Sequence, residues 1–558
     1  MRTLVLLMLI AVSLPTTASG DPRQPILDAM NAELTRSRTA LKIEGYEAPY
    51  FMEFRLVERE HLELESRFGA LIDEDRKRKR EATVNVRVGD YVFDSTPKKD
   101  DYLFEEIGSF RPPKRAPIDG DVGALQATYW LLADQAYKKA VASFLRRKAS
   151  KVTGVEDKQI DSFSREVPKV FSSPMLSIGF DTEKWTGILQ RASARFRRDP
   201  LLLDGTISVR ANFDRLYLVN TEGTRIARDR AIYSVIISGM TRAKDGQLLD
   251  QGRTVYGRSI AELPDEKRLV ALVDAVVEEL GALRDAPIAD PYTGPAILES
   301  EATGVFFHET VGHRLEGERQ NDDQEGQTFK GRKGRRILPE FITVRDDPTA
   351  KRFGDVSLNG HYTIDEQGVA AQNVVLVDKG ILKTFLTSRT PLETVKKSNG
   401  HGRSEGIRPP IARMGNLIVE GANPVTRSRL KTLLLEEVKR QGKPYGLIIR
   451  DITGGSTNTS SYGYQAFKGT PRMVYRVDAT TGEETLVRGV EMVGTPLTAV
   501  SKIMATSDAV GVFNGYCGAE SGYVPVSTVA PPTLFREIEL QRSQRLKEKS
   551  PVLPPPWP

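Results

Sequence analysis

The sequence is short of cysteine. Cys517 is the single cysteine among 558 residues, which excludes an intramolecular disulfide framework and a cysteine-built zinc finger. Any metal site must therefore use histidine and carboxylate ligands with at most one thiolate. A strong excess of charge of one sign is also lacking, since 80 Lys and Arg stand against 74 Asp and Glu. A net charge of +6 does not by itself indicate a nucleic-acid-binding protein.

The composition is that of a soluble globular protein. Hydrophobic residues make up 39% and charged residues 28% of the chain, which excludes a mainly disordered chain and a polytopic membrane protein. At about 100–200 residues per domain, the length suggests roughly two to four domains.

Long hydrophobic runs are nearly absent. Arg2 precedes an apolar run at residues 4–12, which is followed by small residues up to Gly20. This pattern is typical of a signal peptide, because a membrane span needs roughly 20 apolar residues. We therefore predict a signal peptide at residues 1–20 and an exported protein, periplasmic or extracellular, without an integral membrane anchor after cleavage. A retained N-terminal anchor is the alternative.

The first half mixes helices and strands. Apolar residues at helical spacing predict helices over residues 25–41, 121–148, 182–197 and 264–283. Alternation predicts strands over 50–93 and 205–237. A proline-containing break at 285–291 ends this part. We expect an N-terminal α/β domain over residues 21–289.

Residues 76–80 are five consecutive basic residues, and such a basic run can indicate a nucleic-acid-binding segment. Three acidic residues, Asp73 to Asp75, precede it and Glu81 follows it, so most of the charge is offset. We predict a solvated hairpin tip here, and no nucleic-acid partner.

The second half is rich in glycine and short β-like segments. Strands are expected near residues 373–377, 381–386, 416–419, 445–449 and 473–476, and helices over 426–441 and 497–506. The expected fold class is α/β (α+β), with a mixed first domain and a mainly β second domain, residues 290–545, that carries inserted helices. A proline-rich tail is expected at 546–558.

Two of the five histidines, His308 and His313, flank Glu309 in an HExxxH pattern. Histidine is the commonest metal ligand, and a neighbouring glutamate can act as a general base. On an ideal helix the two rings would point about 140° apart. The pair is then either coincidental, or brought together by a π-bulge or by a helix that ends near Gly312.

Cys517 lies in a glycine-flanked segment, Gly515 to Gly518. A lone cysteine is usually a small buried hydrophobe. Together with His308 and His313 it would instead complete a His₂Cys set, and three protein ligands with an open position are the catalytic pattern for zinc.

These residues belong to a longer series of motifs. The series contains the segments 307–313, Leu315-Glu316-Gly317, Asp365-Glu366-Gln367-Gly368, 382–386, Arg408-Pro409-Pro410, Arg413-Met414-Gly415-Asn416, Cys517-Gly518, Gly522, Val524-Pro525-Val526 and Pro532-Thr533-Leu534. In this order and over roughly residues 290–540 the sequence resembles the TldD/PmbA metallopeptidases, also known as modulators of DNA gyrase, and in particular their TldD-type catalytic members.

The resemblance implies a Zn²⁺ ion held by His308, His313 and Cys517, and a C-terminal domain built as a barrel-like, mainly antiparallel sheet. It implies dimers, either of one chain or of a catalytic subunit with a homologue that lacks the metal motif. It also implies degradation of unstructured polypeptides or peptides. The better-known members of the family are cytoplasmic, unlike the exported protein predicted above.

The predicted reaction is metal-assisted peptide hydrolysis with Glu309 as the catalytic base. We name Arg413 and His401 as candidate substrate contacts, although a surface position is the simpler interpretation of His401. Asp365 and Glu366 could orient an imidazole or simply form a turn. The small-residue segment at 454–463 could be a loop beside the substrate or a connector. A non-catalytic zinc-stapled scaffold or regulatory subunit is the rival hypothesis.

Overall fold

The computed structural model describes residues 21–96, 112–153, 160–322, 325–461, 466–543 and 553–556. The predicted signal peptide and most of the predicted tail lie outside these residues. Within the described ranges, no helix combines the length and the apolar character that crossing a membrane requires.

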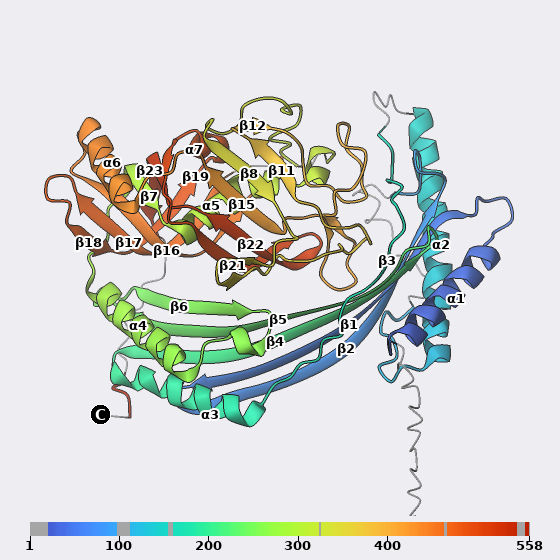
Figure 1. Cartoon of the computed structure of the whole chain (residues 1–558), viewed down its shortest axis with the longest axis horizontal. Helices are drawn as coiled ribbons and strands as arrows, with labels where there is room; N and C mark the ends of the chain where they lie inside the picture. Colours follow the sequence, from blue (N-terminus) through green and yellow to red (C-terminus); the bar gives the residue numbers. More distant parts are fainter. Residues whose placement is uncertain are drawn as a thin grey trace, which may run out of the picture.

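Long antiparallel hairpins build the first sheet. Its strands are β1 (Pro49–Arg67), β2 (Ala70–Val88), β3 (Val170–Ser172), β4 (Leu202–Asn220), β5 (Arg225–Arg242) and β6 (Leu248–Gly257). The order is β2-β1-β4-β5, and β5 also pairs with β6 and, in parallel, with β3. The strands curve strongly, and the second half of the chain lies against the concave face (Figure 1).

Four helices cover the two ends of this sheet: α1 (Gln24–Ala40), α2 (Val122–Thr153), α3 (Thr182–Ser193) and α4 (Glu266–Asp285). The pair α1 and α2 lies at one end of the long strands, and α3 and α4 at the other (Figure 1). The first sheet forms a hydrophobic core with α1 and α2, in which the rings of Phe54 and Tyr129 stack with centroids 4.6 Å apart. Asp181 and Asp265 cap α3 and α4 by accepting a backbone N–H. The helices predicted from spacing are therefore present, with small shifts at their ends.

The predicted hairpin tip at the basic run is wrong. The chain turns at Phe68 and Gly69, where φ is 46° and 88°, and residues 76–80 lie within β2. β1 carries acidic residues opposite this run, and Arg78 and Arg80 both donate to Glu58. The charged stretch is thus one side of a strand ladder, because the neighbouring strand offers complementary charge.

The second half contains a closed barrel. Its strands, in order of pairing, are β16 (Tyr445–Thr457), β7 (Tyr292–Leu298), β23 (Thr533–Arg542), β19 (Val490–Gly494) and β17 (Phe467–Asp478), and β17 pairs back with β16. Two further strands, β18 (Glu484–Val487) and β20 (Ile503–Thr506), extend it. The predicted fold class, mixed α/β first and barrel-like mainly antiparallel second, is confirmed.

A second sheet packs beside the barrel in the order β12-β11-β8-β15-β22-β21. Its strands are β8 (Ile342–Asp346), β11 (Val374–Asp378), β12 (Ile381–Leu382), β15 (Asn416–Gly421), β21 (Gly511–Ala519) and β22 (Gly522–Ala530). Two short pairs complete the strands, namely β9 (Arg352–Phe353) with β10 (Val356–Ser357) and β13 (Gly402–Arg403) with β14 (Ile411–Ala412).

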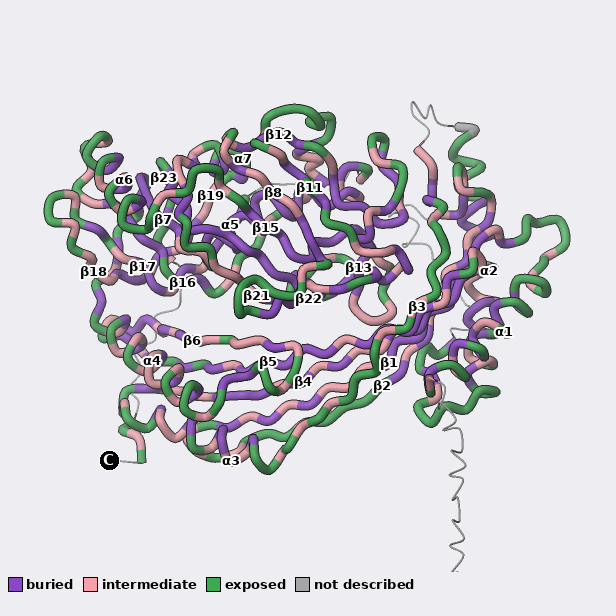
Figure 2. Tube along the Cα trace, in the orientation of Figure 1, coloured by how far each residue is buried: buried purple, intermediate pink, exposed green. Residues whose placement is uncertain are grey.

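Helix α5 (Ser300–Thr310) lies between the barrel and this sheet, and its residues from Ala302 to Thr310 are all buried. Figure 2 shows the buried strands around it. The other helices are α6 (Arg427–Arg440) and α7 (Pro496–Val500). The helix expected over 497–506 stops early, because Ile503–Thr506 pairs with β23 as strand β20.

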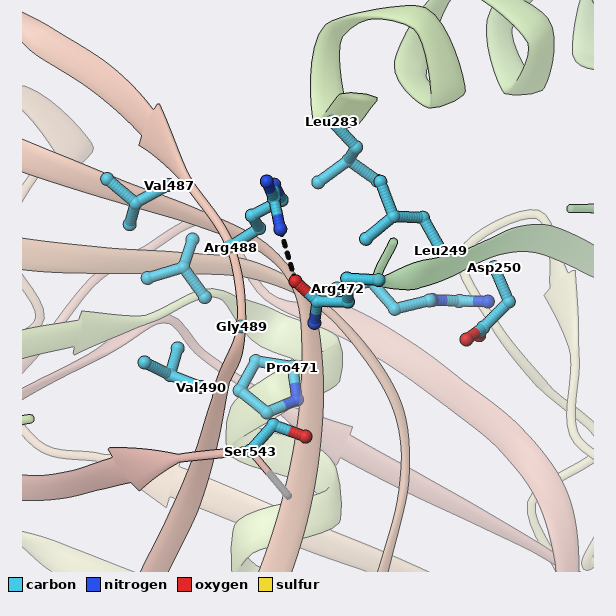
Figure 3. Close-up of a pocket in the computed structure, with 12 residues that line it drawn as sticks. Leu249, Asp250, Leu283, Pro471, Arg472, Val487, Arg488, Gly489, Val490 and Ser543 are labelled. Carbon is cyan, nitrogen blue, oxygen red and sulfur yellow. Dashed lines mark hydrogen bonds between the residues drawn. The ribbon is translucent and has the colours of Figure 1, made fainter. Parts of the chain in front are cut away.

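The two halves are joined by buried arginines. Arg488, which Figure 3 shows in a small pocket between them, donates to the carbonyl of Ala286 at 2.9 Å and to Gln247. On the other side of the molecule, Arg389 donates to Glu222 at 2.8 Å. These contacts fix the sheet against the second half and so define the cleft between them.

Candidate active site

The two motif histidines are brought together by the end of a helix. α5 ends at Thr310, and a 3₁₀ turn over Gly312–Leu315 follows. This tighter turn rotates His313 toward His308, so the ring centroids lie 4.9 Å apart at 85°. Gly312 is required there, since a Cβ atom would lie 2.1 Å from Met414 Sδ.

Cys517 reaches the histidines from β21. Its Sγ lies 3.1 Å from His308 Nε2 and 3.4 Å from His313 Nε2. All three side chains are buried, and their potential ligand atoms lie within 4.8 Å of one another. Residues 204 positions apart in the chain therefore converge on one point.

The electrostatics of this group favour a thiolate. Burial alone would raise the pKa of the Cys517 thiol, but His313 and His308 hold it well below its usual range. Burial likewise opposes charging of the imidazoles, yet Cys517 raises the pKa of both. His313 Nδ1 lies 3.0 Å from Glu316 Oε2, which leaves Nε2 directed at the sulfur. A carboxylate behind a histidine is the usual partner of a metal-binding imidazole.

The donor set fits zinc. Zn²⁺ takes imidazole nitrogen and thiolate sulfur in tetrahedral sites, and such ligands lie about 3.6 Å apart around it. The observed nitrogen–sulfur distances are close to that value. Among the described residues no fourth His, Cys, Asp or Glu joins the group, so one position would stay open.

Glu309 lines the cleft next to this group. Its carboxylate oxygens have no protein partner among the described residues, while its backbone carbonyl accepts a bond from Arg314 at 2.7 Å. Gly455 on β16 packs against it so closely that a Cβ atom would lie 2.7 Å from Glu309 Cγ. The side chain is thus held at the border of the cleft.

The cleft has a volume of about 1030 Å³ and two different walls. One wall is the concave face of the first sheet, from residues on β5 and β6. The other wall comes from α5, β16 and β21. Part of the small-residue segment, Gly454 to Thr457, belongs to β16 and faces the cleft, whereas residues 462–465 lie outside the described residues.

The structure places Arg413 and His401 in the interior. Both are 0% exposed. Arg413 donates to the carbonyls of Cys517 and Gly522, and His401 Nε2 lies 3.1 Å from Asp346 Oδ1. Neither borders the cleft, and only Arg413 contacts the residues of the site, through the carbonyl of Cys517.

Asp365 and Glu366 are also remote from the imidazoles. Asp365 accepts bonds from three backbone N–H groups, and burial raises its pKa to about 7. Glu366 pairs with Arg228 of the first sheet at 2.7 Å. They form a turn and a contact between the two halves, which was the simpler of the two interpretations.

Sequence reasoning named Glu316 only as part of a motif, without a role, and missed the whole sheet wall. The role of Glu316 could have been found, because it stands three residues after His313 and can reach the same side of a turn. The wall residues of β5 and β6, such as Tyr256, could not, since only the tertiary fold brings them opposite the motif.

Comparisons with known proteins indicate a relationship to metallopeptidases. Residues 291–542 match the family described as PmbA/TldA metallopeptidase C-terminal domain. The chain is similar to a metalloprotease of Archaeoglobus fulgidus, 31% identical over 54% of this chain and 65% of that protein. It is also similar to a protein of Buchnera aphidicola named metalloprotease TldD homolog, 23% identical over 72% and 80%.

Some curated relatives are matched over only part of their length. The match spans just under two thirds of the Archaeoglobus protein and 47% of a Methanocaldococcus jannaschii metalloprotease. A Saccharolobus solfataricus protein named zinc metalloprotease TldD homolog is 25% identical over 44% of this chain and 51% of its own length.

Solved structures show the same fold. A Thermotoga maritima protein described as a modulator of a DNA gyrase has a TM-score of 0.62 at 14% identity, covering 92% of this chain and all of that one. TldE from Thermococcus kodakarensis has a TM-score of 0.59 at 14% identity, with the same coverage. The class defined by fold and site is thus a metallopeptidase-type domain on a curved sheet. Residues 291–542 carry the C-terminal domain of the TldD/PmbA family.

The prediction of an exported protein with a signal peptide is wrong. The relatives of the chain include proteins of Buchnera and Saccharolobus named TldD homologs. The better-known members of the family that the sequence resembles are cytoplasmic, so the comparisons do not support export.

Proposed function

We propose that this protein is a zinc-dependent peptidase that hydrolyses unstructured polypeptides or peptides. The observation that carries the proposal is the buried group of His308, His313 and Cys517, which borders a cleft of about 1030 Å³ beside Glu309. A zinc ion that only staples a fold is closed by a fourth protein ligand. The open position favours an enzyme over the scaffold.

In this proposal His308 Nε2, His313 Nε2 and the Cys517 thiolate hold the metal. Bound there, Zn²⁺ supplies a Lewis acid that makes water easier to deprotonate and a carbonyl easier to attack. Glu309 takes the proton of the attacking water and later gives it to the leaving amine. Glu316 keeps His313 in the tautomer that presents Nε2.

The walls of the cleft suit an extended substrate. Among the described strands, β6 and β21 each form an edge of their sheets, and both border the cleft. An extended chain can hydrogen-bond to such an edge, whereas a folded domain has no free strand to offer. This supports unstructured polypeptides as the substrate class.

We also propose that the chain works as a dimer, with itself or with a homologue that lacks the metal motif. The support is its fold likeness to a protein named TldE and its similarity to proteins named TldD homologs.

Metal analysis combined with digestion tests the proposal. Purified protein should contain one Zn²⁺ per chain and degrade an unfolded polypeptide, and a chelator should stop the degradation until zinc is returned. Cys517→Ala should lose zinc and also stability, because a ligand that binds only the folded form stabilises it. Degradation that survives complete zinc removal would contradict the proposal. Unchanged zinc content in Cys517→Ala would make the cysteine a simple core residue.

A further inference from the structure

A second chamber continues from the cleft along the concave face of the first sheet. It has a volume of about 580 Å³. Tyr516 and Tyr523 border both spaces. The ring of Tyr516 also contacts that of Tyr256 on β6, with centroids 6.4 Å apart. The tyrosines therefore stand between two parts of one groove, one part beside Glu309 and the other beyond it.

Two rows of side chains on the first sheet form the floor of the second chamber, and the pairing of the strands determines which residues stand in each row. Lys79, Arg59, Asp214 and Arg230 lie directly opposite one another across β2, β1, β4 and β5. The next row that faces the same way starts with Lys77 and continues through His61, Asn212 and Ile232. Directly opposed residues share one face of a sheet, so these side chains project together.

The chamber is more cationic than the cleft. Five Lys or Arg and three Asp or Glu line it, a net charge of +2, whereas the cleft has four of each. The two lysines are the most exposed of these charges: the side chains of Lys77 and Lys79 are 75% and 51% exposed, and that of Asp214 is 30% exposed. Lys77 pairs with Asp75 at 2.5 Å and Lys79 with Glu81 at 3.1 Å. Because exposed ion pairs are weak, a ligand carboxylate can compete for both ammonium groups.

We propose that the second chamber is a remote subsite that selects acidic side chains of the polypeptide substrate. The inference rests on the proposed function, because the occupant is the same extended chain that passes Glu309. Carboxylates that enter the chamber would meet Lys77, Lys79 and Arg59. Other parts of the substrate would pass the cleft, where four Lys or Arg side chains are matched by four Asp or Glu.

Peptide binding tests the subsite without requiring cleavage. The probe is a fluorescein-labelled 12-residue Gly/Ser peptide with four Glu, compared with the same peptide carrying four Gln. Its anisotropy is measured with zinc-loaded Glu309→Gln protein, so that bound peptide is not consumed. At low salt the Glu peptide should bind about tenfold more tightly, and 0.5 M salt should remove most of the difference, because salt screens such charges.

Matched variants locate the effect. Lys77→Gln/Lys79→Gln should reduce the Glu-to-Gln preference to about twofold. The control Arg76→Gln/Lys138→Gln removes the same charge from another face of β2 and from α2, and should keep the preference. Both Lys77 and Lys79 are exposed, so the variant should fold, and an unchanged melting temperature will show that it does.

Several results would overturn the inference. These are equal binding of the two peptides, an equal loss of preference in the control variant, or tighter binding of a dT dodecamer than of the Glu peptide, which would make the chamber a nucleic-acid surface. The experiments distinguish a failure of the peptidase proposal from a failure of the subsite proposal. Wild-type protein that prefers the Glu peptide but cleaves neither contradicts the peptidase alone, and equal cleavage of both peptides with no binding preference contradicts the subsite alone.

Discussion

At the scale of single residues, replacing Glu309 distinguishes the peptidase hypothesis from the scaffold hypothesis. Glu309→Gln keeps the shape and the hydrogen-bonding capacity of the side chain but removes its basic oxygen. Loss of a general base typically costs a factor of about 10²–10⁴ in rate. We expect cleavage of an unfolded polypeptide to fall by at least that order while zinc content and melting temperature stay nearly unchanged.

A matched control for this variant is Glu520→Gln. Glu520 also lines the cleft, but it is exposed and pairs with Arg319 at 3.5 Å instead of standing beside the histidines. Its replacement should leave the rate within about twofold. Full activity in a zinc-containing Glu309→Gln protein would show that another group accepts the proton.

The convergence of His308, His313 and Cys517 was predictable at this scale, because a single cysteine and two of only five histidines leave few alternatives. The supporting roles of Arg413 and His401 were not. Sequence proximity to a motif does not show whether a side chain points into a cleft or behind it. Both are buried: Arg413 donates to the backbone carbonyl of Cys517, and His401 contacts the side-chain carboxylate of Asp346.

At the scale of elements, the junction between α5 and the 3₁₀ turn positions His313. In Gly312→Ala the new methyl group would overlap Met414, which is fully buried and cannot move away freely. Overpacking of this kind costs about 1–3 kcal/mol. We expect a lower melting temperature and a zinc affinity reduced at least tenfold, measured by competition with a chromogenic chelator.

A double variant tests whether the clash with Met414 causes the loss of zinc affinity. Gly312→Ala/Met414→Ala makes room for the methyl group and should recover much of the zinc affinity, although the cavity left by Met414 costs stability of its own. Gly454→Ala serves as a control, because a Cβ atom there meets nothing within 4 Å. A double variant that binds zinc as weakly as the single one would mean that the glycine acts through backbone freedom instead.

Helices were easier to predict than strands at this scale. Apolar spacing located α4 and α6 to within a few residues, since one face of each is buried on a core. The hairpin tip predicted at the basic run was wrong because a run of charged residues is also typical of a turn. The acidic partners of these residues lie on β1, and only the strand pairing shows them, for example Glu58 opposite Arg80. The 497–506 segment splits because pairing with β23 overrides local helical spacing.

At the scale of the whole molecule, the cleft exists only while the two halves stay docked. A buried ion pair joins them: Arg228 of β5 donates to Glu366 at 2.7 Å and to the carbonyl of Ile364. Burial alone would raise the pKa of Glu366, but Arg228, Arg230 and Arg403 together hold it below its usual value. The sequence pattern gave no indication of this pair, whose members are 138 residues apart.

The lowered pKa of Glu366 makes docking dependent on pH. An acid with a depressed pKa in the folded state stabilises that state above its ordinary value of 4.5, and the stabilisation is lost as the pH falls toward the folded-state pKa. Glu366→Gln leaves Arg228 buried without its counter-charge, which costs about 3–5 kcal/mol at pH 7. The variant should then lose less stability than wild type between pH 5 and pH 3, because it has one fewer carboxylate to protonate. Urea unfolding at each pH measures both effects.

Glu420→Gln is the control, because it removes an exposed carboxylate that pairs with Arg345. This variant should cost under about 1 kcal/mol and leave the curve of stability against pH parallel to wild type. If the Glu366→Gln curve also runs parallel to wild type, the pair does not carry the acid sensitivity, and docking depends on the other buried contacts of Arg389 and Arg488.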